Sequence, residues 1–172
     1  MVALAMPRSS VLRSPGDGLL CGEHFQVAYA TNDIGRACAL FRDRFGIAEF
    51  LRLEGQMPAG GTIRVELAWV GPVMYELLSA SGPGSAVYMD RLPQGPGFAL
   101  GHHHFGYLLS SAEQWDAMLA KAAAENCAIP YQNDNPGFLR SCFVDAAPLG
   151  HYLEYILPDP AGLAFLQSVP RT

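Results

Sequence analysis

The sequence predicts an α+β protein made of two βαβββ modules, joined in tandem around a single divalent-metal site. The order of strand-like and helix-like segments runs through the chain twice. An offset of 78 residues superposes chemically similar side chains from the two halves. A glutamate also stands inside the last apolar strand of each half. These three observations indicate two related modules that share one site.

The first module, residues 21–80, begins with a strand-like run at 26–30. Asp33 can cap the helix that follows, in which apolar side chains recur at helical spacing. Gly46 is positioned to end that helix. Three β-rich runs, separated by Gly- and Pro-containing turns, complete the module: residues 47–54, 62–70 and 73–79.

The second module, residues 101–158, repeats this order after a Gly- and Pro-rich connector at 81–100. A strand is followed by Ser110 and Glu113, which have the spacing of a helical capping box. A helical apolar pattern follows, and then three strand-like runs: residues 128–131, 140–145 and 151–157. We expect residues 159–172 to form a helix and tail, and residues 1–20 a flexible arm.

Composition favours a globular protein that acts on small molecules. Half of the 172 residues are hydrophobic and 16% are charged, and no apolar run is long enough to span a membrane. The net charge of −5 leaves no basic stripe for nucleic acid. The N-terminus lacks the pattern of a secretory signal, so we expect a cytoplasmic protein. The four cysteines lack CxxC spacing and are expected to be reduced core residues.

The offset of 78 places Gln26 on His104 and Glu76 on Glu154. In each half, a residue able to bind a metal is followed 50 positions later by a glutamate in an apolar strand. An ionised glutamate is costly to bury without a partner. A solvent-facing position or an arginine partner would explain one such residue, whereas a shared cation would explain all four side chains.

This ligand set suits Zn²⁺, Ni²⁺, Co²⁺, Mn²⁺ or Fe²⁺, because it combines one imidazole, one amide oxygen and two carboxylates. His24 and His102 are also 78 residues apart, and each lies two residues before a proposed ligand. By strand alternation they share its face, so they are either alternative ligands or residues that support the ligands. His103 is expected on the opposite face. Arg64 and Arg140 lie on strands and are candidates for binding a substrate carboxylate, or else surface arginines.

Several stretches resemble the vicinal oxygen chelate superfamily, which contains glyoxalase I, methylmalonyl-CoA epimerase, extradiol dioxygenases and bleomycin- or fosfomycin-resistance proteins. The resemblance covers residues 22–158, and its motifs are QVAYATNDIGRACALFRDRFG, YELLSASGPGS, HHHFGYLL and FVDAAPLGHYLEYI. It implies a curved, eight-stranded, open-barrel-like sheet around one metal ion. Carried over position by position, the ligands implied are Gln26, Glu76, His104 and Glu154.

The resemblance implies a metal-dependent lyase or isomerase whose substrate binds through adjacent oxygens. The metal ion acts as a Lewis acid, and Glu154 or Glu76 takes a proton from the carbon next to a carbonyl. Ala30 and Ala80 replace residues associated with glutathione binding in one type of glyoxalase I. A homodimer is the usual assembly of the family.

Two alternatives remain at this point. The chain is a non-enzymatic binding protein of the resistance type, which holds a planar or aromatic ligand between the modules. Otherwise it is an Fe²⁺ extradiol-type dioxygenase, which uses two histidines and one carboxylate and would need His24 or His102 as a ligand. Gln26 makes the dioxygenase alternative less favoured, because it stands where that ligand set has a histidine.

Overall fold

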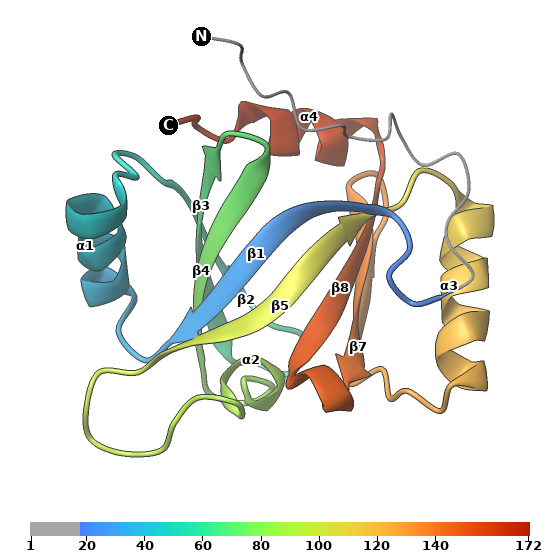
Figure 1. Ribbon diagram of the computed structural model, residues 1–172, viewed down its shortest axis with the longest axis horizontal. Helices are drawn as coiled ribbons and strands as arrows, with labels where there is room; N and C mark the ends of the chain where they lie inside the picture. Colours follow the sequence, from blue (N-terminus) through green and yellow to red (C-terminus); the bar gives the residue numbers. More distant parts are fainter. Residues whose placement is uncertain (1–17) are drawn as a thin grey trace, which may run out of the picture.

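The structure is a computed structural model that describes residues 18–172. Residues 1–17 of the expected N-terminal arm therefore lie outside the described residues. The described chain forms one mixed eight-stranded sheet that curls into a half-barrel, with helices against it (Figure 1). The predicted α+β class and the curled sheet are confirmed.

The strand order in the sheet is β2-β3-β4-β1-β5-β8-β7-β6. The strands are β1 (Glu23–Thr31), β2 (Leu51–Gln56), β3 (Thr62–Val70), β4 (Val73–Ser81), β5 (Leu100–Leu108), β6 (Tyr131–Asn135), β7 (Leu139–Ala146) and β8 (His151–Pro158). In each module the last strand runs parallel to the first, β4 beside β1 and β8 beside β5. The modules meet where β1 and β5 pair antiparallel. Each half therefore contributes four consecutive strands.

The helices α1 (Ile34–Phe45) and α3 (Ala112–Ala124) begin 78 residues apart, as the offset requires. Asp33 caps α1 by accepting a hydrogen bond from the backbone N–H of Arg36. Ser111 caps α3 in the same way, accepting from the N–H of Gln114. The predicted cap Ser110 was wrong by one residue. The offset itself would have corrected it, because residue 33 shifted by 78 is residue 111.

Two predicted strands are displaced, because an apolar run was taken for a strand in each module. Ile47 is fully buried below α1, where its N–H bonds to the carbonyl of Phe41. The pairing strand β2 begins only at Leu51. Likewise, the run 128–131 largely precedes β6, which is a polar strand. Both true strands are sheet edges, where side chains face solvent and apolar patterning weakens.

Helices cover the convex side of the sheet and one end of its concave side. α1 and α3 lie on the two outer flanks in Figure 1. The short α2 (Ala86–Met89), a 3₁₀ turn (Ala147–Leu149) and α4 (Pro160–Ser168) complete the structure. Leu166 of α4 packs with Phe25 and Met74 in a core that closes one end of the concave side.

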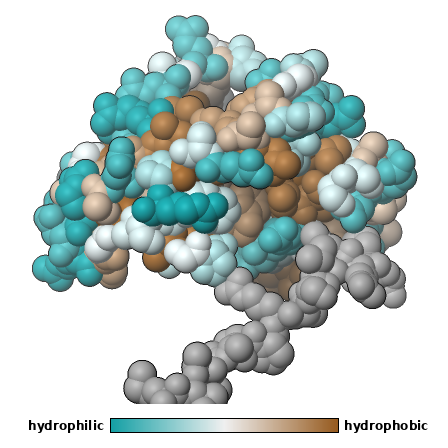
Figure 2. Space-filling view, turned by 90° about the horizontal axis from the view of Figure 1, so that it is seen from above, coloured by the Kyte–Doolittle hydropathy of each residue, from teal (hydrophilic) through white to brown (hydrophobic). Residues whose placement is uncertain are grey.

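The surface seen from above Figure 1 carries apolar patches bordered by hydrophilic side chains (Figure 2). Leu163 of α4 is one of the exposed apolar residues. None of the helices within residues 18–172 is long and apolar enough to cross a membrane. The four cysteines are free, as expected from their spacing.

Replacing the observed cap tests the helix boundary. Ser111→Ala removes the side-chain acceptor for the N–H of Gln114 and should lower the free energy of unfolding by about 1 kcal/mol. Ser110→Ala is the matched control, and it should cost clearly less. Urea unfolding followed by circular dichroism measures both. A larger loss for Ser110→Ala would contradict the assignment.

Candidate metal centre

The centre lies where β1 and β5 pair. Across this pair, Gln26 stands opposite Gly106, and Ala28 stands opposite His104. Outside them, Glu76 of β4 pairs with Ala28, and Glu154 of β8 pairs with Gly106. Positions 28 and 106 are related by the same offset of 78, and both are small. A side chain at Gly106 would collide with Gln26, so glycine leaves room for the amide.

Four buried polar side chains converge there from the two modules. Ligand atoms of Glu76, His104 and Glu154 all lie within 4.8 Å of one another. His104 Nε2 is 3.0 Å from Glu154 Oε2 and 3.9 Å from Glu76 Oε2. Gln26 Nε2 donates a hydrogen bond to Glu76 Oε2. Each of the four residues is at most 9% exposed, so the group is shielded from water.

Two register shifts in the β1–β5 pairing lie on either side of the segment that carries Gln26 and His104. The partners step from His24↔Tyr107 to Gln26↔Gly106, which leaves Phe25 as an extra residue. In β5 the extra residue is His103. Positions 25 and 103 are again 78 apart. Bulges of this kind re-aim side chains and are frequent beside functional sites.

The shifts separate His24 and His102 from the ligand face. The ring of His102 packs against Tyr29 and Phe105 rather than toward the carboxylates. The expectation that both histidines share the ligand face was wrong, because strand alternation fails across an inserted residue. Each still supports its neighbour: His24 Nε2 lies 3.1 Å from the Gln26 carbonyl oxygen, and His102 Nε2 lies 3.1 Å from that of His104.

His103 lies on the same side as His104, contrary to prediction, and it fixes the tautomer of that imidazole. His103 Nε2 is 2.9 Å from the carbonyl oxygen of Val87, so this nitrogen carries the proton. Burial lowers the pKa of His103 to about 3, so its Nδ1 is unprotonated. Nδ1 of His104, 2.8 Å away, must therefore donate to it. The lone pair of His104 Nε2 then faces the two glutamates.

Two buried atoms of the group have lone pairs that could bind a cation. Gln26 Oε1 and His104 Nε2 are buried and lack a hydrogen-bond partner among the described residues. Buried polar atoms rarely lack partners, and a cation bound between them would satisfy both atoms. With its amide rotated by a half-turn, Gln26 would present its oxygen beside Glu76. Three oxygen donors and one imidazole suit the divalent metals named above.

Burial also sets the protonation of the metal-free group. Desolvation raises the pKa of Glu154 to about 8. Desolvation likewise raises the pKa of Glu76 to about 7, opposed by His104 and aided by Glu154. Desolvation lowers the pKa of His104 to about 4. The 3.0 Å approach of His104 Nε2 to Glu154 Oε2 therefore joins two neutral groups and is not an ion pair.

The family comparison agrees with this geometry. The family model described as Glyoxalase/Bleomycin resistance protein/Dioxygenase superfamily matches residues 24–155, which include all four converging side chains. The chain belongs to this superfamily. A comparison with curated proteins found no match.

Solved structures resemble this superfamily member at low identity. A methylmalonyl-CoA epimerase from Mycobacterium tuberculosis is 18% identical, covers 86% of this chain and 94% of its own, and superposes with a TM-score of 0.55. A Streptomyces coelicolor methylmalonyl-CoA epimerase variant in complex with 2-nitronate-propionyl-CoA is 14% identical, with 79% and 96% covered and a TM-score of 0.54. A hypothetical protein from Bacillus halodurans C-125 is 13% identical, with 80% and 94% covered and a TM-score of 0.52. These identities show a shared fold.

The two arginines named from the sequence lie away from the centre and have carboxylate partners. Arg64 Nη2 is 2.6 Å from Glu66 Oε1, and Arg140 Nε is 3.2 Å from Asp134 Oδ2. Along β3, Arg64 alternates with residues 63 and 65, which pack with the concave core. It therefore faces the convex side.

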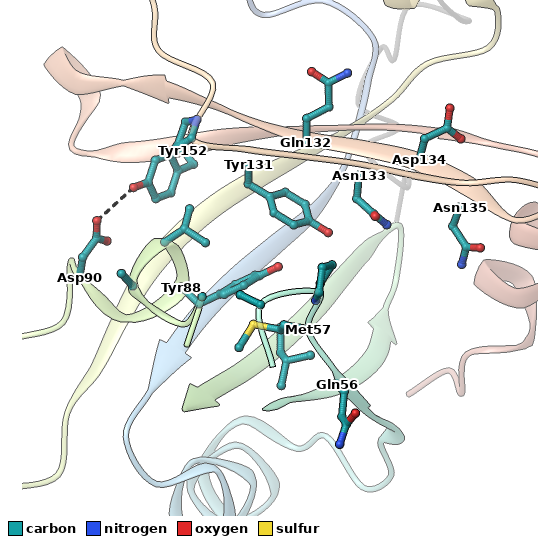
Figure 3. Close-up of a pocket in the computed structure, with 17 residues that line it drawn as sticks. Gln56, Met57, Tyr88, Asp90, Tyr131, Gln132, Asn133, Asp134, Asn135 and Tyr152 are labelled. Atoms are coloured by element: carbon teal, nitrogen blue, oxygen red, sulfur yellow. Dashed lines mark hydrogen bonds between the residues drawn. The ribbon is translucent and has the colours of Figure 1, made fainter. Parts of the chain in front are cut away.

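Of the aromatic side chains that close the centre, only Tyr88 of the connector could be named as a candidate from the sequence. The ring of Phe143 is 5.2 Å from that of His104 and 4.9 Å from that of Tyr131. Tyr88, from the connector helix α2, stacks on His103 at 6.2 Å. Tyr131 and Tyr88 also line a cavity (Figure 3). No spacing motif marks them, because their role depends on the curl of the sheet.

Replacing His103 tests the tautomer assignment. His103→Phe keeps an aromatic ring but removes the acceptor for His104 Nδ1–H, so divalent-metal affinity should fall about 10- to 100-fold. His102→Phe is the matched control and should bind metal as tightly as the wild type. Competition with a chromophoric chelator measures both affinities. Equal affinities for His103→Phe and the wild type would contradict the assignment.

The raised carboxyl pKa values predict that metal binding displaces protons. Because the folded pKa values exceed the ordinary value of 4.5, the two groups favour the metal-free fold most below pH 4.5. That contribution is lost as the pH rises through about 7 and about 8. Metal ligation needs the ionised forms, so metal affinity should increase over the same interval.

Calorimetric titration of Zn²⁺ into chelator-treated protein, in buffers of different ionisation enthalpy, measures this proton release. About two protons per metal ion are expected at pH 6, because both carboxyl groups are mostly protonated there. The release should fall toward zero above pH 9. A release that did not vary with pH would show that these carboxyl groups are not the ligands.

Proposed function

We propose that this superfamily member is a metal-dependent lyase or isomerase that removes a proton from the carbon next to a carbonyl group. The observation that carries the proposal is the pair of buried glutamates at repeat-equivalent positions, flanking one neutral imidazole. A structural ion pair needs opposite charges, which this group does not supply. Two carboxylates around a divalent cation leave one available for proton transfer.

Gln26, Glu76, His104 and Glu154 would hold the metal ion. When bound, the ion supplies Lewis-acid polarisation of adjacent substrate oxygens and stabilises the developing oxyanion. The surrounding side chains exclude water, since each of the four residues is nearly fully buried. His103 holds the His104 ring in the orientation that presents Nε2.

Glu154 is the better candidate for the base. Gln26 lies beside Glu76, to which its Nε2 donates a hydrogen bond in the metal-free group, and that bond lowers the pKa of Glu76. The raised pKa of Glu154 has burial as its one cause. Because Glu154 has fewer such restraints than Glu76, its carboxylate can accept a proton from carbon and return it.

Glutamine substitutions test this division of roles. Both substitutions replace a charged ligand with a neutral one, so each should lower metal affinity. With metal supplied in excess, Glu154→Gln should lower the rate of proton exchange about 100-fold or more, and Glu76→Gln should lower it less. The exposed residue Glu49 provides the control variant, Glu49→Gln, which should change neither quantity.

The assay is deuterium uptake from D₂O at the carbon next to the carbonyl, followed by NMR, with metal content measured in parallel. Its panel consists of 2-hydroxy ketones, 2-oxo acids and methylmalonyl-CoA, the last because epimerases of this fold act on it. If both glutamine variants retained full metal content and full exchange, the base assignment would be lost.

A second candidate function is non-enzymatic binding of a small molecule. The cavity between the modules favours it, because that cavity is lined with aromatic side chains and does not include the four buried residues. A protein that binds a ligand equally well with and without metal, and exchanges no proton, would be of this kind. The dioxygenase alternative is weakened, since His24 and His102 lie off the ligand face. A homodimer and a cytoplasmic location remain predictions.

A further inference from the structure

A cavity of about 830 Å³ lies between the two modules, outside the metal centre. Its walls come from β6, from α2 with the loop before it, and from the turn after β2 (Figure 3). Tyr131 of β6 and Tyr152 of β8 belong to one module, while Met57 and Ile63 belong to the other. A ligand bound here would therefore contact both halves of the chain.

Aromatic rings form the inner wall of the cavity. The rings of Tyr88 and Tyr131 are 5.8 Å apart and meet edge to face. Phe143 lies 5.7 Å from Tyr88 and, on its other side, 5.2 Å from His104. Phe143 therefore lies next to both the cavity wall and the centre. Planar aromatic ligands are well suited to such a wall, because rings pack favourably at these distances.

The polar groups of the cavity are mainly neutral. Along β6, the side chains of Asn133 and Asn135 point into the cavity, whereas those of Gln132 and Asp134 point away (Figure 3). This alternation follows from the strand. The amides can donate and accept hydrogen bonds but cannot neutralise a charged ligand.

The cavity has no positively charged wall among the described residues. None of the described residues that line it is lysine, arginine or histidine. Asp90 lines it, and its carboxylate accepts a hydrogen bond from the Tyr152 hydroxyl at 3.3 Å. The nearby Arg91 is held by Asp145 at 2.6 Å and lies over the ring of Tyr152. An anionic group entering this cavity would meet a carboxylate and find no free cation among the described lining residues.

We propose that this cavity binds the aromatic part of a ligand that is uncharged or cationic there. The proposal rests on the proposed function in one respect: the aromatic part is the end of the substrate remote from the reacting carbon. The substrate is then aromatic and non-anionic at the end remote from the reacting carbon. Acyl-CoA and glutathione conjugates, whose remote ends are anionic, fall outside this class.

Three probes that share one ring system but differ in charge test the proposal: 1-naphthylmethylamine, 1-naphthalenemethanol and 1-naphthaleneacetate. Binding to the full chain is followed by naphthalene fluorescence, with and without Zn²⁺. The amine and the alcohol should bind, and the acetate should bind about tenfold more weakly or not at all.

Lysine substitutions on the two sides of β6 test whether the probes bind in this cavity. Asn133→Lys puts an ammonium group into the cavity and should weaken amine binding while strengthening acetate binding. Gln132→Lys is the matched control on the other side of the same strand, and it should leave the order of affinities unchanged. Tyr131→Ala should weaken all three probes, because it removes part of the aromatic wall.

Tighter binding of the acetate to the wild type would overturn the proposal. It would also be overturned by absence of binding for all three probes at millimolar concentration, or by equal effects of Asn133→Lys and Gln132→Lys. Probe binding does not depend on proton transfer, so it can be measured in Glu154→Gln. A chain that binds the amine but never exchanges a proton would refute the proposed function alone.

Discussion

The antiparallel pairing of β1 with β5 is the interaction on which the candidate site depends. This pairing joins the modules, and its continuous register over residues 26–28 and 104–106 places Gln26 opposite Gly106 and His104 opposite Ala28. The adjacent parallel strands then supply the two glutamates at matching heights. The extra residue in each strand interrupts alternation beside this segment, so His103 lies on the side of His104 while His24 and His102 lie off it.

Burial of the two carboxyl groups is the second constraint. In the metal-free chain they can remain buried by keeping their protons, since desolvation raises both pKa values toward neutrality. A divalent cation removes the need for those protons and also satisfies Gln26 Oε1 and His104 Nε2. The same residues thus account for stability without metal and for affinity toward it.

The repeat was readable from the sequence, because the fold duplicates chemistry as well as element order. The offset of 78 identified Gln26 and His104 as partners. The sequence could not show the register shifts, since an inserted residue leaves no compositional mark, and so His103 was placed on the wrong face. The edge strands β2 and β6 were predicted a few residues too early for a different reason. Both are polar and lack the apolar alternation by which buried strands are recognised.

An anomalous difference map from crystals grown with Co²⁺ tests whether the four converging side chains bind one metal ion. We predict one strong peak per chain, about 2.0–2.2 Å from His104 Nε2 and from side-chain oxygens of Gln26, Glu76 and Glu154. The absence of a peak there, or a peak bound instead by His24 or His102, would contradict it.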